Sequence, residues 1–178
     1  MRQPFLTGSK PLTLDKKSRL MVPSDYRRVL PSDEFGDAFY VVLGRDGRLL
    51  LFPERWYESL YRHTATNTAA QSATGQRSNM LFFAMAERVE MDKQGRVILP
   101  PWHVGKAKLQ EQVTLAGCGD HLELWNTPEY EQYRDRIFDQ TNDLHDAELR
   151  KTAIQGAGDL TGTAQVAPFT HGAFQSDG

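Results

Sequence analysis

Cysteine is nearly absent from this chain of 178 residues, in which Cys118 stands alone. A single thiol excludes an internal disulfide framework and any zinc site built from several cysteines. Long apolar runs are also lacking, because no stretch of the sequence approaches the roughly 18 residues that a membrane-spanning helix needs. The first ten residues contain no apolar signal-peptide segment, so we expect a cytoplasmic protein with no membrane partner.

A large net charge is missing too, since the formal net charge is −2 at pH 7. The charges are nevertheless distributed unevenly. Residues 1–30 hold seven Lys and Arg against two Asp, residues 88–108 hold five against two acidic residues, and residues 120–150 hold three against nine. A chain of this kind can present a basic face to a polyanion and an acidic face elsewhere. Charge alone does not identify the partner.

What the sequence does contain is an internal repeat. The segment LDKKSRLMVP at 14–23 matches MDKQGRVILP at 91–100, and a second match relates residues 43–60 to residues 116–133 in the same order. The offset falls from 77 to 73, which indicates extra residues in the first copy around positions 31–37. This insertion is rich in Pro, Ser, Asp and Gly, so we expect it to form a surface loop.

The repeat predicts the domain organisation. Residues 5–63 form the first copy, and residues 80–150 form the second copy with a C-terminal helix. Residues 64–79 contain one charged residue and no large apolar residue, which suits a linker or a loosely packed helix. Residues 151–178 are expected to be a disordered tail, since 156–178 contain five glycines and no Lys or Arg.

Each copy is predicted to be mainly β with appended helices, an α+β fold. A first strand ends near Leu14 or Met91, a turn follows, and a second strand stops at Pro23 or Pro100, where a short helix can begin. Glycine-rich turns then predict one hairpin per copy, followed by an amphipathic helix. Four short strands cannot bury an apolar face alone, so the copies are expected to share the core of a pseudo-two-fold β-barrel or sandwich.

The turn Asp-Lys-x-(Ser/Gly)-Arg, present in both copies, is the candidate binding site. Asp15 and Asp92 are expected to shape their own turns by accepting backbone N–H groups, and Ser18 and Gly95 stand where the chain needs positive φ. The cations of both turns would then project onto one surface, where they can bind DNA phosphates and guanine edges. They are Lys16, Lys17, Arg19, Lys93 and Arg96.

The same spacing also has a purely structural interpretation. Arg19 and Arg96 could pair with Asp15 and Asp92 inside each turn, as a salt bridge would require. An arginine held by a carboxylate can still donate outward, so the two interpretations are compatible. The sequence therefore leaves two functions open. The protein could bind double-stranded DNA, or it could be a protein-interaction module, such as an antitoxin-like scaffold.

The segments LDKKSRLMVPSDYR, FFAMAERVEMDKQGRVILP and LELWNTPEY resemble the MraZ proteins of bacteria, double-copy members of the SpoVT/AbrB-like superfamily. The resemblance runs from Phe5 to Arg150 and implies a swapped-hairpin β-barrel. It also implies a nucleoid-associated transcriptional regulator of the division and cell-wall gene cluster, which binds short direct repeats upstream of its operon and assembles into homo-oligomeric rings. Ser18 stands where the family usually has glycine, so the first loop is expected to be reshaped.

No residue pattern indicates an enzyme, a metal site or a cofactor. The five histidines lie without metal-ligand spacing, and a catalytic role for Cys118 would need a histidine partner that the sequence cannot place. A glycine-rich loop ending in Lys-Ser or Lys-Thr is absent from the sequence, which excludes the usual nucleotide-hydrolysis motif. The three tryptophans are expected to pack in the core or against helices rather than to stack on unpaired bases.

Overall fold

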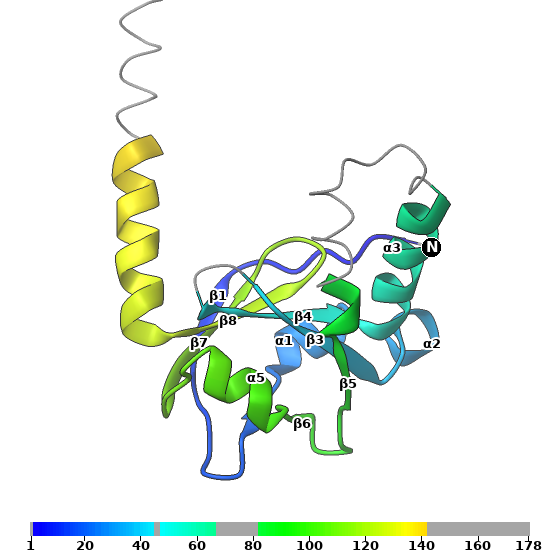
Figure 1. Ribbon diagram of the computed structural model, residues 1–178, viewed down its shortest axis with the longest axis horizontal. Coiled ribbons are helices and arrows are strands. Elements are labelled where there is room, and N and C mark those ends of the chain that lie inside the picture. The colour runs from blue at the N-terminus through cyan, green and yellow to red at the C-terminus, as the bar shows by residue number, and fades with distance from the viewer. Residues whose placement is uncertain (1, 45–46, 67–81, 142–178) are drawn as a thin grey trace, which may run out of the picture. The chain divides into compact units, whose positions relative to one another are not determined.

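The structure of the protein is a computed structural model that describes residues 2–44, 47–66 and 82–141 (Figure 1). The chain divides into two compact units, residues 1–133 and residues 134–178. Elements of the first copy are β1 (Ser9–Thr13), β2 (Arg19–Met21), α1 (Ser24–Arg28), α2 (Ser32–Phe35), β3 (Ala38–Leu43), β4 (Leu49–Pro53) and α3 (Glu54–Thr66). Those of the second copy are β5 (Glu87–Glu90), β6 (Arg96–Ile98), α5 (Pro101–Lys106), β7 (Gln112–Gly117) and β8 (Leu122–Asn126), followed by a helix over residues 127–141.

Strands of the two copies are interleaved in one antiparallel sheet of order β1-β7-β8-β4-β3-β5, and β2 pairs with β6 in a separate two-stranded ribbon. Each first strand pairs with the hairpin of the other copy: β1 with β7, and β5 with β3. Replacing every strand by its counterpart in the other copy gives the same order read from the opposite edge of the sheet. The two copies therefore exchange strands and fold as one body, because neither has a complete sheet of its own.

The sheet is open, so the predicted closed barrel is not what the structure shows. Strands β1 and β5 lie at the two edges of the six-stranded sheet and do not pair with each other. The second strands could have bridged these edges, but β2 and β6 are only three residues long and pair with one another instead. Beyond these edges the named strands do not continue the sheet, and an isolated antiparallel bridge between Met91 and Val97 links the end of β5 to β6.

Equivalent helices anchor the two copies in the same way. The Tyr26 hydroxyl, on α1, donates to the backbone carbonyl of Gly8 at 2.8 Å. His103, on α5, lies 77 residues further on, and its Nε2 contacts the carbonyl of Met85, the counterpart of Gly8, at 2.8 Å. Both side chains are almost fully buried, at 2% and 1% exposure. A buried polar group needs such a partner, so each bond fixes a helix to the chain that leads into the first strand.

Several local predictions need correction. The segment expected to be a surface loop contains α2, whose last residue, Phe35, is fully buried. Gly36, at φ +84, ends this helix and lets the chain turn into β3. Trp102, expected to pack in the core or against helices, lies on α5 and is 41% exposed, whereas Trp125 is buried. The segment 64–79, expected to be a linker or a loosely packed helix, is not tested: its first three residues end α3, and the rest of it and the predicted tail lie outside the described residues.

The larger of two apolar clusters lies between the six-stranded sheet, the β2–β6 ribbon and the short helices. It draws fully buried side chains from both copies. None of the helices in the described ranges combines the length and the apolar character needed to cross a bilayer. The largest of the buried aliphatic side chains are Leu6, Leu20, Leu49, Leu51, Leu99, Leu115, Leu122 and Leu124.

Candidate nucleic-acid interface

The first turn is closed by the carboxylate of Asp15. Its Oδ1 accepts the backbone N–H groups of Lys17, at 2.8 Å, and of Arg19, at 2.9 Å. Its Oδ2 accepts the Nε–H of the Arg19 side chain. The backbone adds two further bonds, from Ser18 N to Asp15 O at 2.9 Å and from Asp15 N to Arg19 O at 3.2 Å. These bonds hold the loop rigid while Lys16 and Lys17 remain exposed.

The second turn has the same hydrogen bonds at equivalent positions. Oδ1 of Asp92 accepts the backbone N–H groups of Gln94 and Arg96, each at 2.9 Å. Its Oδ2 accepts from Nε of Arg96 at 2.9 Å and also lies 2.8 Å from Nη2. Gly95 N donates to Asp92 O at 2.8 Å, and Lys93 is exposed at the tip. The salt bridge of the structural interpretation is therefore present in both turns.

These hydrogen bonds favour the ionised form of both aspartates. The backbone N–H of Arg19 and then its side chain hold the pKa of Asp15 below its ordinary value of 3.8. The backbone N–H and the side chain of Arg96 lower the pKa of Asp92 in the same way. Both turns consequently keep a negative carboxylate at their base and positive side chains outside it at neutral pH.

The β2–β6 ribbon fixes where the two turns lie. Arg19 begins β2 directly after the first turn, and Arg96 begins β6 directly after the second. Because the strands are antiparallel, with Arg19 opposite Ile98 and Met21 opposite Arg96, the turns lie at opposite ends of one short ribbon. Both project to the same side, below the sheet as drawn in Figure 1.

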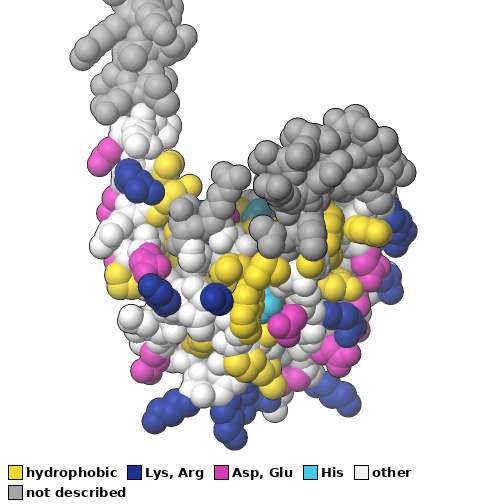
Figure 2. All heavy atoms as spheres, in the orientation of Figure 1, with side chains coloured by type: hydrophobic (Ala, Val, Ile, Leu, Met, Phe, Trp, Pro, Cys, Tyr) yellow, Lys and Arg dark blue, Asp and Glu magenta, His cyan; other side chains and the backbone are white. Residues whose placement is uncertain are grey.

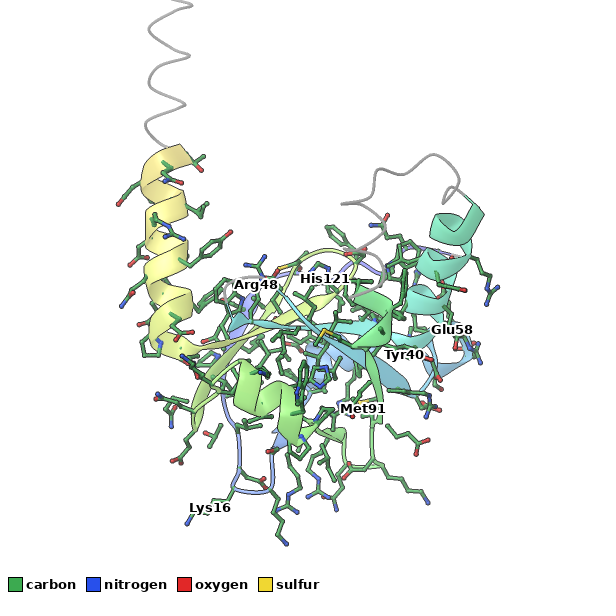
Figure 3. All side chains as sticks on the ribbon, in the orientation of Figure 1. Lys16, Tyr40, Arg48, Glu58, Met91 and His121 are labelled. Carbon is green, nitrogen blue, oxygen red and sulfur yellow. The ribbon has the colours of Figure 1, made fainter. Side chains whose placement is uncertain are left out.

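The basic side chains of this region form a single exposed edge. Figure 2 shows Lys and Arg gathered along the lower rim, where both turns lie, and Figure 3 shows Lys16 pointing outward from the first of them. Behind the tips of the turns, the side chains of Arg19 and Arg96 are 41% and 34% exposed. All five predicted cations thus lie in the two turns or at the strand ends beside them: Lys16, Lys17, Arg19, Lys93 and Arg96.

The residue at the bend distinguishes the two turns. Ser18 and Gly95 both have positive φ, at +56° and +83°. A side chain at Gly95 would place its Cβ 2.7 Å from Nε of Arg27, a residue of α1 that donates to Val22 O at 3.0 Å. The counterpart of Arg27 beside Ser18 is Val104, in the wall of a groove of about 410 Å³. A side chain at Gly95 would thus displace Arg27, whereas Ser18 has an open groove beside it, and the expected reshaping of the first loop does not occur.

Away from the turns, the β7–β8 hairpin brings three potential metal ligands together. Ligand atoms of Cys118, His121 and Glu123 all lie within 4.8 Å of one another. Sequence spacing did not reveal this group, because the four-residue turn between β7 and β8 folds position 118 back towards position 123. Glu123 already pairs with Nε of Arg48 at 3.0 Å, and His121 Nδ1 lies 2.6 Å from Asp120. Figure 3 labels His121, which lies in the turn of this hairpin, and Arg48.

The chemistry of this group opposes both a metal and a catalytic role. Desolvation and the Glu123 carboxylate raise the pKa of the Cys118 thiol to about 12, so the thiol is protonated at neutral pH. Burial lowers the pKa of His121, but Glu123 and Asp120 outweigh it and raise this pKa above 6.5. The positive charge of Arg48 would also repel a cation. We therefore interpret the group as an ion-pair network that fixes the hairpin.

Comparison with known proteins gives consistent matches over most of the chain. Residues 5–79 and 82–152 each match the family described as "MraZ protein, putative antitoxin-like". Curated relatives named "Transcriptional regulator MraZ" include one from Mycoplasmopsis pulmonis, 30% identical over 84% of this chain and 98% of its own length. Another, from Chromobacterium violaceum, is 38% identical over 71% of this chain and 84% of its own length. A third, from Paraburkholderia phytofirmans, is 36% identical over 69% of this chain and 83% of its own length.

Proposed function

The chain belongs to the MraZ family, and from this premise we propose that it is a transcriptional regulator that binds double-stranded DNA through its two basic turns. The relatives are named for transcriptional regulation. The single observation that carries the proposal is the pair of rigid cationic turns at the two ends of the ribbon, which project to the same side of the sheet. Such a surface complements a duplex, whose phosphates repeat at regular intervals.

Within this proposal the residues of each turn have separate roles. Lys16, Lys17 and Lys93 contact phosphates, since exposed lysines at loop tips supply charge without fixed geometry. Arg19 and Arg96 are oriented by their aspartates through Nε, and their outer nitrogens donate to phosphates or base edges. The aspartates shape the turns and do not contact DNA, because their oxygens are occupied by the turn itself.

One chain would neutralise few phosphates, so we also propose that several copies act together. A homo-oligomer, such as a ring, would place successive pairs of turns on successive direct repeats upstream of the operon that it controls. Binding of the first subunit raises the effective concentration of the next, which converts weak contacts into a stable complex. This assembly would associate with the nucleoid in the cytoplasm.

The proposal is tested by a gel-shift titration of the DNA upstream of its gene at two salt concentrations. We expect wild-type affinity to fall steeply with salt, because phosphate contacts release counterions. Replacing both turn arginines, Arg19→Ala with Arg96→Ala, should weaken binding about 30-fold or more. The matched control is Arg62→Ala, which removes a cation from α3. Circular dichroism and oligomer size should not change in either variant; unchanged affinity of the double variant would refute the assignment.

A protein-interaction module is the second candidate, and two observations favour it. The matching family description includes the words antitoxin-like. The structure also has a groove of about 390 Å³ beside α3, lined in part by the aromatic rings of Tyr40, Tyr57, Tyr61 and Phe83. Recovery of a stoichiometric protein partner on immobilised chain, together with no retention of DNA at low salt, would favour this candidate over the first.

A further inference from the structure

The outward face of the β2–β6 ribbon carries two exposed apolar side chains. Strand residues alternate between faces, and Leu20 and Val97, in the middle of each strand, are fully buried. Their neighbours along the strands therefore point away from the core. Among these neighbours Met21 is 43% exposed and Ile98 is 61% exposed.

On the outward face of the ribbon, Met21 and Ile98 each lie opposite an arginine of the other strand. Ile98 lies opposite Arg19, and Met21 lies opposite Arg96. On this outward face the two arginines are diagonal neighbours, about 7–8 Å apart at the backbone, and the two apolar side chains occupy the other diagonal. A surface that bound phosphates alone would gain nothing from exposing large apolar groups at its centre. The pattern is instead suited to a partner that offers both hydrogen-bond acceptors and apolar groups.

The major groove of B-DNA offers this combination. Guanine presents acceptors that arginine can reach, and thymine presents its C5-methyl group as the apolar feature of the groove. The groove is about 12 Å wide and admits a two-stranded β-ribbon. The lysine tips at both ends of the ribbon would then meet the phosphates that flank the groove.

We propose that the β2–β6 ribbon enters the major groove and that Met21 and Ile98 contact thymine C5-methyl groups, which makes them determinants of sequence specificity. This inference rests on the proposed DNA-binding function. A second copy of the chain is the less suitable occupant for two reasons. Five cations surround this face and would repel an identical surface. Two apolar side chains also fall far short of the roughly 800 Å² per partner that a stable interface buries.

Uracil provides the sharpest test, because deoxyuridine lacks only the C5-methyl group and pairs as thymidine does. The probes are the DNA upstream of the gene, prepared once with thymidine and once with deoxyuridine throughout. Wild-type protein should bind the uracil duplex more weakly, by about fourfold for each methyl group that a side chain covers. The variant Met21→Ala with Ile98→Ala should bind the thymine duplex more weakly and lose most of this preference.

The matched control is Val29→Ala, which shortens an exposed apolar side chain outside the ribbon and should keep the wild-type preference for thymine. Equal wild-type affinity for both duplexes, with the salt dependence and the loss in the arginine variant retained, would overturn this inference and leave the proposed function intact. A change in oligomer size with an unchanged thymine preference in the ribbon variant would also overturn it, in favour of a self-interface. Absence of binding to either duplex at low salt would refute both.

Discussion

The first and second turns have the same hydrogen bonds but different surroundings. Each is closed by one aspartate that accepts two backbone N–H groups and an arginine side chain. In the second turn a Cβ at Gly95 would lie 2.7 Å from Arg27 Nε and displace that side chain, whereas the first turn accommodates Ser18 beside an open groove. The aspartate therefore determines the shape of the turn. The size of the residue at the bend corresponds to the space that its neighbours leave.

This comparison also shows what duplication within one chain permits. Two identical chains related by a two-fold axis would present identical turns. Here the copies share one sheet and have diverged at the bend and at the residue packed beside it, where Arg27 in one copy corresponds to Val104 in the other. We expect the second turn, which is braced by α1, to be the more sensitive to substitution.

The largest effect should come from Gly95→Ser, which gives the second turn the residue of the first. Positive φ and the contact with Arg27 together should cost about 2–4 kcal/mol in the free energy of unfolding. Adding Arg27→Val, which copies the environment of Ser18, should recover part of this loss. Urea denaturation of the two single variants and the double variant measures the coupling. Additive effects would show that Arg27 does not restrict the bend.

A smaller effect of opposite sign is expected for Ser18→Gly. Glycine adopts φ near +56° without the steric cost that serine has, although it also raises the entropy of the unfolded chain. We expect a net stabilisation of about 0.5–1 kcal/mol, measured as an increased urea midpoint. A decreased midpoint would mean that the serine side chain contributes contacts that outweigh its backbone strain.

Lowering the pH should reduce the stabilising contribution of the aspartate in both turns. The pKa of each aspartate is lowered in the folded protein below 3.8, the ordinary value. Their stabilising contribution is therefore complete above pH 3.8 and is lost as pH falls through the lower, folded pKa. An NMR titration of the Asp15 and Asp92 carboxyl carbons should give two pKa values below 3.8. A value above 3.8 for either aspartate would contradict the hydrogen-bonding pattern of that turn.

Much of this arrangement could be predicted from sequence, because it depends on local chemistry. The turns, their aspartates, the strands beside them and the prolines that open α1 and α5 all follow from short patterns. The pairing of β1 with β7, about a hundred residues away, could not be predicted. Apolar alternation determines which face of a strand is buried, but it does not identify the neighbouring strand.

The candidate site shows the same limit. Sequence places cations in both turns, but it assigns Met21 and Ile98 only to short apolar strands and does not say which way they face. Only the pairing of β2 with β6 reveals that these two side chains face outward. Phe35 was misassigned for the opposite reason, because a polar and proline-rich context concealed one buried aromatic ring.

The salt dependence of DNA binding tests most directly whether the two turns form one phosphate-binding edge. The logarithm of the association constant should fall linearly with the logarithm of salt concentration for the wild-type protein. The variant Lys16→Gln, Lys17→Gln, Lys93→Gln should reduce this slope by about 0.9 for each lysine that contacts a phosphate. Arg62→Gln should leave the slope unchanged. Identical slopes for the wild type and the triple lysine variant would contradict the central claim that these tips meet the DNA backbone.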